Sequence, residues 1–184
     1  VHGITIDGAG NIALVGMYEG AVTFIPGEVG TTLTSAGSFD VFVAEYAEDG
    51  SPLWARSIGD TGYDYGASIA HDGAGDVYVT GDLHQGAFNL SSSKVFVSKF
   101  ANDGTPVWTT ESADYGTQHL GDGICASDAG VVSITGEFFD SFTLGSFTLD
   151  AGTAEATIYV AKLSSDGVPL WAQKAGAGGY AFGE

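Results

Sequence analysis

Three tryptophans lie in one recurring local sequence, and this repeat constrains the fold more than any other feature of the chain. The copies are VFVAEYAEDGSPLWARSIG (41–59), VFVSKFANDGTPVWTTESA (95–113) and IYVAKLSSDGVPLWAQKAG (158–176). Trp54, Trp108 and Trp171 are therefore equivalent structural repeat markers, 54 and 63 residues apart. Units of about this length are typical of propeller blades or solenoid coils.

A second module recurs between the tryptophan segments. Its copies are GITIDGAGNIALVG (3–16), ASIAHDGAGDVYVTG (67–81) and GICASDAGVVSITG (123–136). Alternating apolar residues and Asp-Gly turns predict antiparallel hairpins throughout, hence an all-β fold of β-propeller-like repeats. We expect three four-stranded antiparallel blades within a single repeat domain, with units at roughly 1–62, 63–118 and 119–184.

In the first unit, the strands are expected at about 3–7, 11–18, 40–47 and 52–58. The link between the second and third strands varies most from unit to unit. It carries further strand-like pieces, AVTFI in the first unit and FTLGSFTLD in the third.

These segments also resemble a known family. The run LTSAGSFDVFVAEYAEDGSPLWARSIG and the DGAGDVYVTG turn are similar to the bacterial β-propeller repeats of large secreted and surface proteins. The resemblance covers essentially the whole chain in three copies, although the second shortens its link to FNLSSSKVFVSKF and the third shifts its turn at SDAG. It implies four-stranded blades and a secreted, repetitive parent protein, and no catalytic residues.

Three blades leave a physical problem, because closed propellers usually have about 4 to 8 blades. Two large apolar faces would stay exposed, which a soluble monomer rarely tolerates. The repeat spacing continues from Trp171 through the C-terminal residues into residues 1–16 in nearly correct register. We therefore expect the ends, residues 176–184 against 1–16, to be complementary to each other or to those of a neighbouring copy, which would give rings or filaments.

Charge and motifs narrow the function. The formal net charge of −18 disfavours nucleic-acid and membrane-surface binding. Nucleophile elbows, phosphate loops and zinc-type motifs are missing, so we expect no enzymatic activity and no cofactor. The four histidines fall at non-equivalent repeat positions, which predicts no histidine metal cluster: His2, His71, His84 and His119.

Calcium is a weaker hypothesis, because Asx-Gly loops also form turns without any ion. Its candidate ligands are Asp60, Asp64, Asp7 and Asp72. Asn89 begins an N-glycosylation sequon. Cys125, the single cysteine, sits in an alternating run that predicts a buried small residue.

Two functions remain open. The first is a non-enzymatic extracellular or cell-surface scaffold whose copies join head to tail into a filament or surface array. The alternative is a lectin-like or adhesin-like module that closes a propeller by oligomerising and binds glycans on exposed tyrosines. The candidate tyrosines are Tyr18, Tyr63, Tyr65, Tyr115 and Tyr180.

Overall fold

The computed structural model describes the chain except residues 25–31, 87–91, 114, 153–155 and 176–184. The described residues form strands and turns, with no helix and hence none that could cross a membrane. The strands are β1 (Gly3–Ile6), β2 (Ile12–Thr23), β3 (Thr32–Tyr46), β4 (Pro52–Ile58), β5 (Asp64–His71), β6 (Val77–His84), β7 (Ser93–Phe100), β8 (Pro106–Glu111), β9 (Gly123–Ala126), β10 (Val132–Phe138), β11 (Ser141–Leu144), β12 (Phe147–Asp150), β13 (Thr157–Leu163) and β14 (Pro169–Ala175).

The strands form four antiparallel sheets rather than three. Sheet 1 is β1-β2-β3-β4, sheet 2 is β5-β6-β7-β8 and sheet 3 is β9-β10-β13-β14. The fourth sheet is a hairpin of β11 and β12, because the variable link of the third unit pairs with itself. In sheet 1 the corresponding link instead lengthens β2 and β3, which continue their pairing to Thr23 and Thr32 beyond an irregularity after Glu19.

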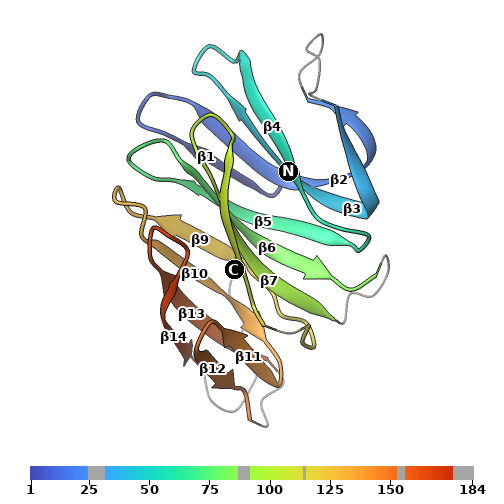
Figure 1. The fold of residues 1–184 in the computed structure, drawn as a ribbon, viewed down its shortest axis with the longest axis vertical. Coiled ribbons are helices and arrows are strands. Elements are labelled where there is room, and N and C mark those ends of the chain that lie inside the picture. Colours follow the sequence, from blue (N-terminus) through green and yellow to red (C-terminus); the bar gives the residue numbers. More distant parts are fainter. Residues whose placement is uncertain (25–31, 87–91, 114, 153–155, 176–184) are drawn as a thin grey trace.

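Sheets 1, 2 and 3 lie in an open row, one after another down the molecule (Figure 1). Their first strands are neighbours: β1 contacts β5, and β5 contacts β9. The described sheets do not close into a ring. Each of the two junctions between sheets therefore has a buried apolar layer. On the outer face of sheet 1, Phe42 and Ala44 are buried in a smaller cluster, where Phe24 at the end of the long β2–β3 extension packs on Phe42 with ring centroids 4.8 Å apart. No other described sheet packs on the outer face of sheet 1 or of sheet 3.

The two layers are built from alternating residues that point toward the neighbouring sheet. Between sheets 1 and 2 the layer includes Val15, Val43, Ile69 and Phe96, all buried. The layer between sheets 2 and 3 is larger because the β11–β12 hairpin adds Phe142 and Leu144. Phe142 stacks on Tyr159 with ring centroids 4.3 Å apart.

Candidate functional site

Trp54, on the last strand of sheet 1, contacts sheet 2 across the junction between these two sheets. The indole Nε1 of Trp54 donates a hydrogen bond to the carbonyl oxygen of Asn102, 3.2 Å away. A Cβ added to Gly104 would meet the Trp54 ring at 2.5 Å, so only glycine lets the ring lie this close to the turn. Gly104 also has φ of +76°, which disfavours any other residue. Trp54 on one sheet and the Asp-Gly turn on the next thus form an interlock.

The junction between sheets 2 and 3 repeats this interlock with equivalent residues. Trp108 Nε1 donates to the carbonyl oxygen of Ser165 at 2.9 Å. A Cβ on Gly167 would meet the Trp108 ring at 2.7 Å. Both junctions are therefore joined in the same way: a tryptophan of the earlier sheet donates to the Asp-Gly turn of the later sheet.

Both halves of a third interlock are present at the two ends of the row. Trp171 of sheet 3 is 39% exposed, against 5% for Trp54, and its indole donates to no described residue. At the opposite end, Gly50 of sheet 1 is exposed, and a Cβ there would meet nothing within 4 Å. Gly104 and Gly167, its equivalents, are both buried.

The apolar residues of the open faces follow the same pattern. Ile4 of β1 is 68% exposed, whereas its equivalent Ile69 of β5 is 6% exposed and packed against sheet 1. Val160 of β13 is partly exposed, whereas its equivalent Val43 of β3 is fully buried. Val160 borders a shallow, mainly apolar depression together with Thr135 and Cys125. The depression beside Val160 and the exposed Ile4 thus lie on the outer faces of sheets 3 and 1, at positions whose equivalents Val43 and Ile69 are buried together between sheets 1 and 2.

Cys125 lies on the outer face of sheet 3 and is exposed, so the prediction of a buried residue was wrong. Its alternating sequence indicates a strand residue correctly, since it lies in β9. Its equivalent Ala70 is buried, because sheet 3 covers the corresponding face of sheet 2. Alternation could not reveal that no described sheet packs on this face.

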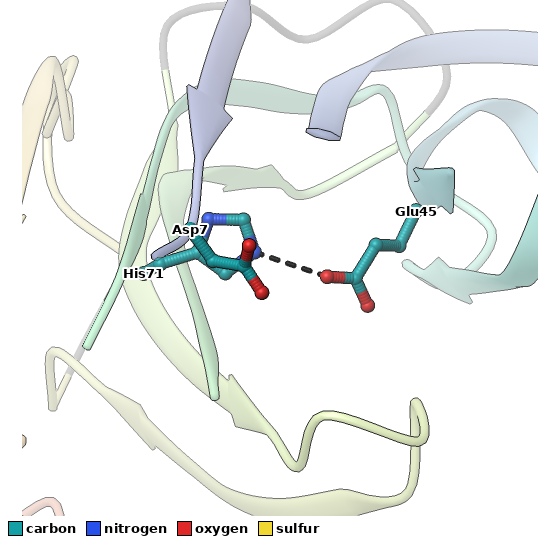
Figure 2. A group of neighbouring side chains, drawn as sticks. All are labelled: Asp7, Glu45 and His71. Atoms are coloured by element: carbon teal, nitrogen blue, oxygen red, sulfur yellow. Dashed lines mark hydrogen bonds and ion pairs between the residues drawn. The ribbon is translucent and has the colours of Figure 1, made fainter. Parts of the chain in front are cut away.

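A partly buried polar cluster lies at the junction of sheets 1 and 2. Asp7, Glu45 and His71 each offer one potential ligand atom, and these three atoms lie within 4.8 Å of one another. Figure 2 shows the Asp7 carboxylate beside the His71 ring, with Glu45 extending toward them from β3. Glu45 Oε1 and His71 Nε2 are 3.1 Å apart, and both side chains are almost fully buried.

The prediction that the four histidines form no metal cluster among themselves concerns another arrangement, since His71 is the single histidine of this group. A sequence signal for this cluster existed: Glu45 occupies the repeat position of Lys99 and Lys162. The two predicted ligands of the same sequence motif, Asp7 and Asp72, are separated between sheets 1 and 2, and only Asp7 joins the cluster.

The predicted aspartates are turn residues in the structure. Asp7 Oδ1 accepts the amides of Ala9 and Asn11 at 2.9 and 2.8 Å. Burial acts to raise the pKa of Asp7, but the hydrogen bonds from Asn11 and Ala9 outweigh it and lower the pKa. Asp72 Oδ1 accepts the amides of Ala74 and Asp76 in the same way.

Asp60 and Asp64 lie close together, as their spacing predicts, with Asp60 in the loop before β5 and Asp64 as the first residue of that strand. Asp64 Oδ2 accepts the amide of Asp60 at 2.8 Å, and its Oδ1 accepts the amide of His84 at 3.2 Å. Burial of Asp64 raises its pKa to about 6, and the neighbouring charges of Asp60 and Asp40 act in the same direction. Asn89 lies outside the described residues, as do Tyr180 and the predicted joint at 176–184.

A polar hollow lies beside the β11–β12 hairpin. Its lining residues are Tyr115, Gly116, Thr117, His119, Asp140, Ser141 and Thr143. Lys94 Nζ lies over the Tyr115 ring, 4.7 Å from its centroid. Tyr18, another predicted stacking residue, is buried and shares a hydrogen bond of 2.8 Å with the Ser57 hydroxyl, so it cannot bind a glycan from solvent.

Residues 53–82 match the model of the beta-propeller repeat family. No curated protein matches the sequence. The matched stretch covers most of β4, all of β5 and most of β6. Residues 53–82 thus form a β-propeller repeat.

The propeller repeat is out of phase with the sheets. Its matched residues begin on the last strand of sheet 1, at the tryptophan interlock, and end on the second strand of sheet 2. One propeller repeat therefore spans a junction and includes Trp54, which joins the two sheets. The repeat pattern encodes the contact between successive sheets as well as the sheets themselves.

Proposed function

We propose that this protein is a non-enzymatic scaffold that assembles head to tail, outside the cell, through the outer faces of sheets 3 and 1. The single observation that carries the proposal is the interlock, formed twice inside the chain and present in two unjoined halves at its ends. In the proposed contact, Trp171 of one copy lies on the Gly50 turn of the next copy and donates to the carbonyl oxygen of Glu48. The Ile4 side chain of that next copy fills the depression beside Val160.

The direction of the contact favours assembly of many copies in a linear series. Each copy has one tryptophan half and one turn half on different faces, so the contact is heterologous rather than two-fold symmetric. Heterologous contacts form rings when the rotation closes and filaments when it does not. We propose the filament or surface array, with other copies as partners.

The test uses variants that each remove one half of the contact. Trp171→Ala removes the tryptophan half, and Ile4→Lys places a charge on the opposite face. Each variant alone should sediment as a monomer at concentrations where the wild type assembles. Their mixture should form a dimer and stop there, because it retains one intact contact between one copy of each.

Leu170→Ala is the matched control. Leu170 precedes Trp171 on β14 and is about equally exposed, but its equivalents Leu53 and Val107 are also exposed in sheets 1 and 2. The exposure of Leu170 therefore does not result from sheet 3 lying at the end of the row. The Leu170→Ala variant should assemble like the wild type. Assembly that survives Trp171→Ala, or a wild-type chain that stays monomeric up to millimolar concentration, would refute the proposal. Electron microscopy that shows closed rings alone would reject the filament.

The polar hollow at Tyr115 favours a second candidate, the lectin-like or adhesin-like module. It combines an aromatic ring with hydroxyl and carboxylate groups, which is a composition suited to sugars. Lys94 covers one face of the Tyr115 ring, so a glycan would have to stack on the other face. A glycan array probed with wild type and Tyr115→Ala separates this candidate: binding lost in the variant supports it, and no binding by the wild type rejects it.

A further inference from the structure

The cluster of Asp7, Glu45 and His71 breaks a charge pattern that sheet 2 keeps. In sheet 2, Lys99 Nζ lies 2.8 Å from Asp76 Oδ2 and 3.9 Å from Asp72 Oδ2. The turn carboxylates there are thus neutralised by a lysine of the same sheet. Burial of charged groups without such a partner is costly.

In sheet 1 the equivalent lysine is replaced by an acidic residue, and the equivalent of Asp76 is the neutral Asn11. Asp7 occupies the position of Asp72, and Glu45 occupies the position of Lys99. No lysine or arginine among the described residues forms an ion pair with Asp7 or Glu45. Two carboxylates therefore face one imidazole at a buried junction, where sheet 2 has an ordinary salt bridge.

The hydrogen bonds of the cluster are also incomplete. Glu45 is 1% exposed, and its Oε2 atom has no hydrogen-bond partner among the described residues. The Nδ1 atom of His71 likewise has none. Buried carboxylate oxygens are nearly always satisfied by a donor or a cation. A protonated His71 would supply one donor to Glu45 Oε1 and would leave Oε2 unsatisfied.

We propose that Asp7, Glu45 and His71 bind a divalent transition-metal ion of the Zn²⁺ type at the junction of sheets 1 and 2. One imidazole nitrogen and two carboxylates are a donor set suited to Zn²⁺. Ca²⁺ prefers six to eight oxygen ligands. The Asp7 oxygens already accept three hydrogen bonds from Ala9 and Asn11, which leaves little capacity for such a shell.

The role of the metal ion follows from its position. Asp7 and Glu45 belong to sheet 1 and His71 to β5 of sheet 2, so an ion bound by all three would cross-link the two sheets. It would stabilise their relative orientation, on which the direction of the open row depends. This inference is independent of head-to-tail assembly, because all three ligands come from one chain.

The test is titration of the EDTA-treated chain with ZnCl₂ by isothermal calorimetry, with CaCl₂ as a separate arm. We expect one Zn²⁺ per chain and an upward shift of the melting temperature. Glu45→Gln and Asp7→Asn should each weaken binding by more than about 100-fold, since loss of a direct ligand should exceed the 10- to 100-fold effect of outer partners. Asp7→Asn keeps a side-chain oxygen to accept the turn amides, so it separates ligand loss from misfolding.

Two further variants sharpen the outcome. Glu45→Lys restores the residue type of sheets 2 and 3; it should abolish zinc binding and raise the melting temperature of the metal-free chain. Asp103→Asn removes an equal charge from an exposed turn of sheet 2 and should leave zinc binding unchanged. Zinc affinity equal in wild type, Glu45→Gln and Asp7→Asn would overturn the proposal. So would preference for Ca²⁺, or the absence of binding at about 100 μM Zn²⁺.

Discussion

The three tryptophans provide an internal series in which the same substitution should have unequal effects on the monomer. Trp54 is 5% exposed and donates to Asn102, whereas Trp171 is 39% exposed and donates to no described residue. For a side chain that buries up to about 250 Å², this difference corresponds to about 85 Å² of surface. At about 25 cal/mol per Å² it is worth about 2 kcal/mol.

The hydrogen bond increases this difference. A typical internal hydrogen bond contributes about 1 kcal/mol net, so Trp54→Ala should destabilise the monomer by about 3 kcal/mol more than Trp171→Ala. Trp108→Ala should resemble Trp54→Ala, since Trp108 also donates to the next sheet. Trp171→Ala still loses the contacts that its ring makes within its own sheet, so its effect should be smaller rather than zero.

The assay is urea unfolding followed by far-ultraviolet circular dichroism at low micromolar concentration, with sedimentation of each sample to verify that it is monomeric. The slope of the transition must be the same in each variant for the free energies to be compared. Equal destabilisation by Trp54→Ala and Trp171→Ala would refute the reasoning, because it would mean that Trp171 is already packed against a further part of its own chain.

Three other results are expected. Burial raises the pKa of Asp64 to about 6, above the 3.8 of an ordinary aspartate, so the protonated carboxyl stabilises the fold at low pH and this contribution is lost as the pH rises from about 4 to about 6. Over this range the wild type should lose up to about 3 kcal/mol of unfolding free energy relative to Asp64→Asn. Urea titration of both proteins at each pH measures this difference. Self-association should strengthen from 20 to about 300 mM NaCl in sedimentation experiments, because salt screens repulsion between chains of net charge −18; weakening would point to ion pairs across the contact instead. Maleimide should label the exposed Cys125 rapidly in dilute solution and slowly in the assembled protein, and Trp171→Ala should stay reactive at every concentration.

Much of the fold can be predicted from local sequence, because a strand's alternation and its turn residues are local properties. The strands expected at 3–7 and 52–58 are found at Gly3–Ile6 and Pro52–Ile58. Those expected at 11–18 and 40–47 extend to Thr23 and back to Thr32, since the link residues continue the same pairing. The strand-like piece FTLGSFTLD forms β11 and β12 by turning back at Gly145, where φ is +59°.

The exposure of equivalent residues could not be predicted, because it depends on neighbouring sheets. Trp54 and Trp171 have the same local sequence context, yet among the described sheets only Trp54 has a further sheet beside it. Cys125 and Ala70 differ in the same way. Periodicity shows which face of a strand is apolar, and the number of sheets in the row decides whether that face is covered.

The cluster of Asp7, Glu45 and His71 shows where comparison of repeats adds information that motifs lack. No metal motif includes Asp7, Glu45 and His71, because the three residues are distant in sequence and meet only when sheets 1 and 2 pack together. The replacement of a repeated lysine by Glu45 is nevertheless visible in the sequence. In a repeat protein, a position that reverses its charge in one copy must exchange its partner for one of opposite sign. Here that partner has to come from His71 of the next sheet or from a bound cation, and this requirement makes Glu45 the residue on which the zinc proposal depends.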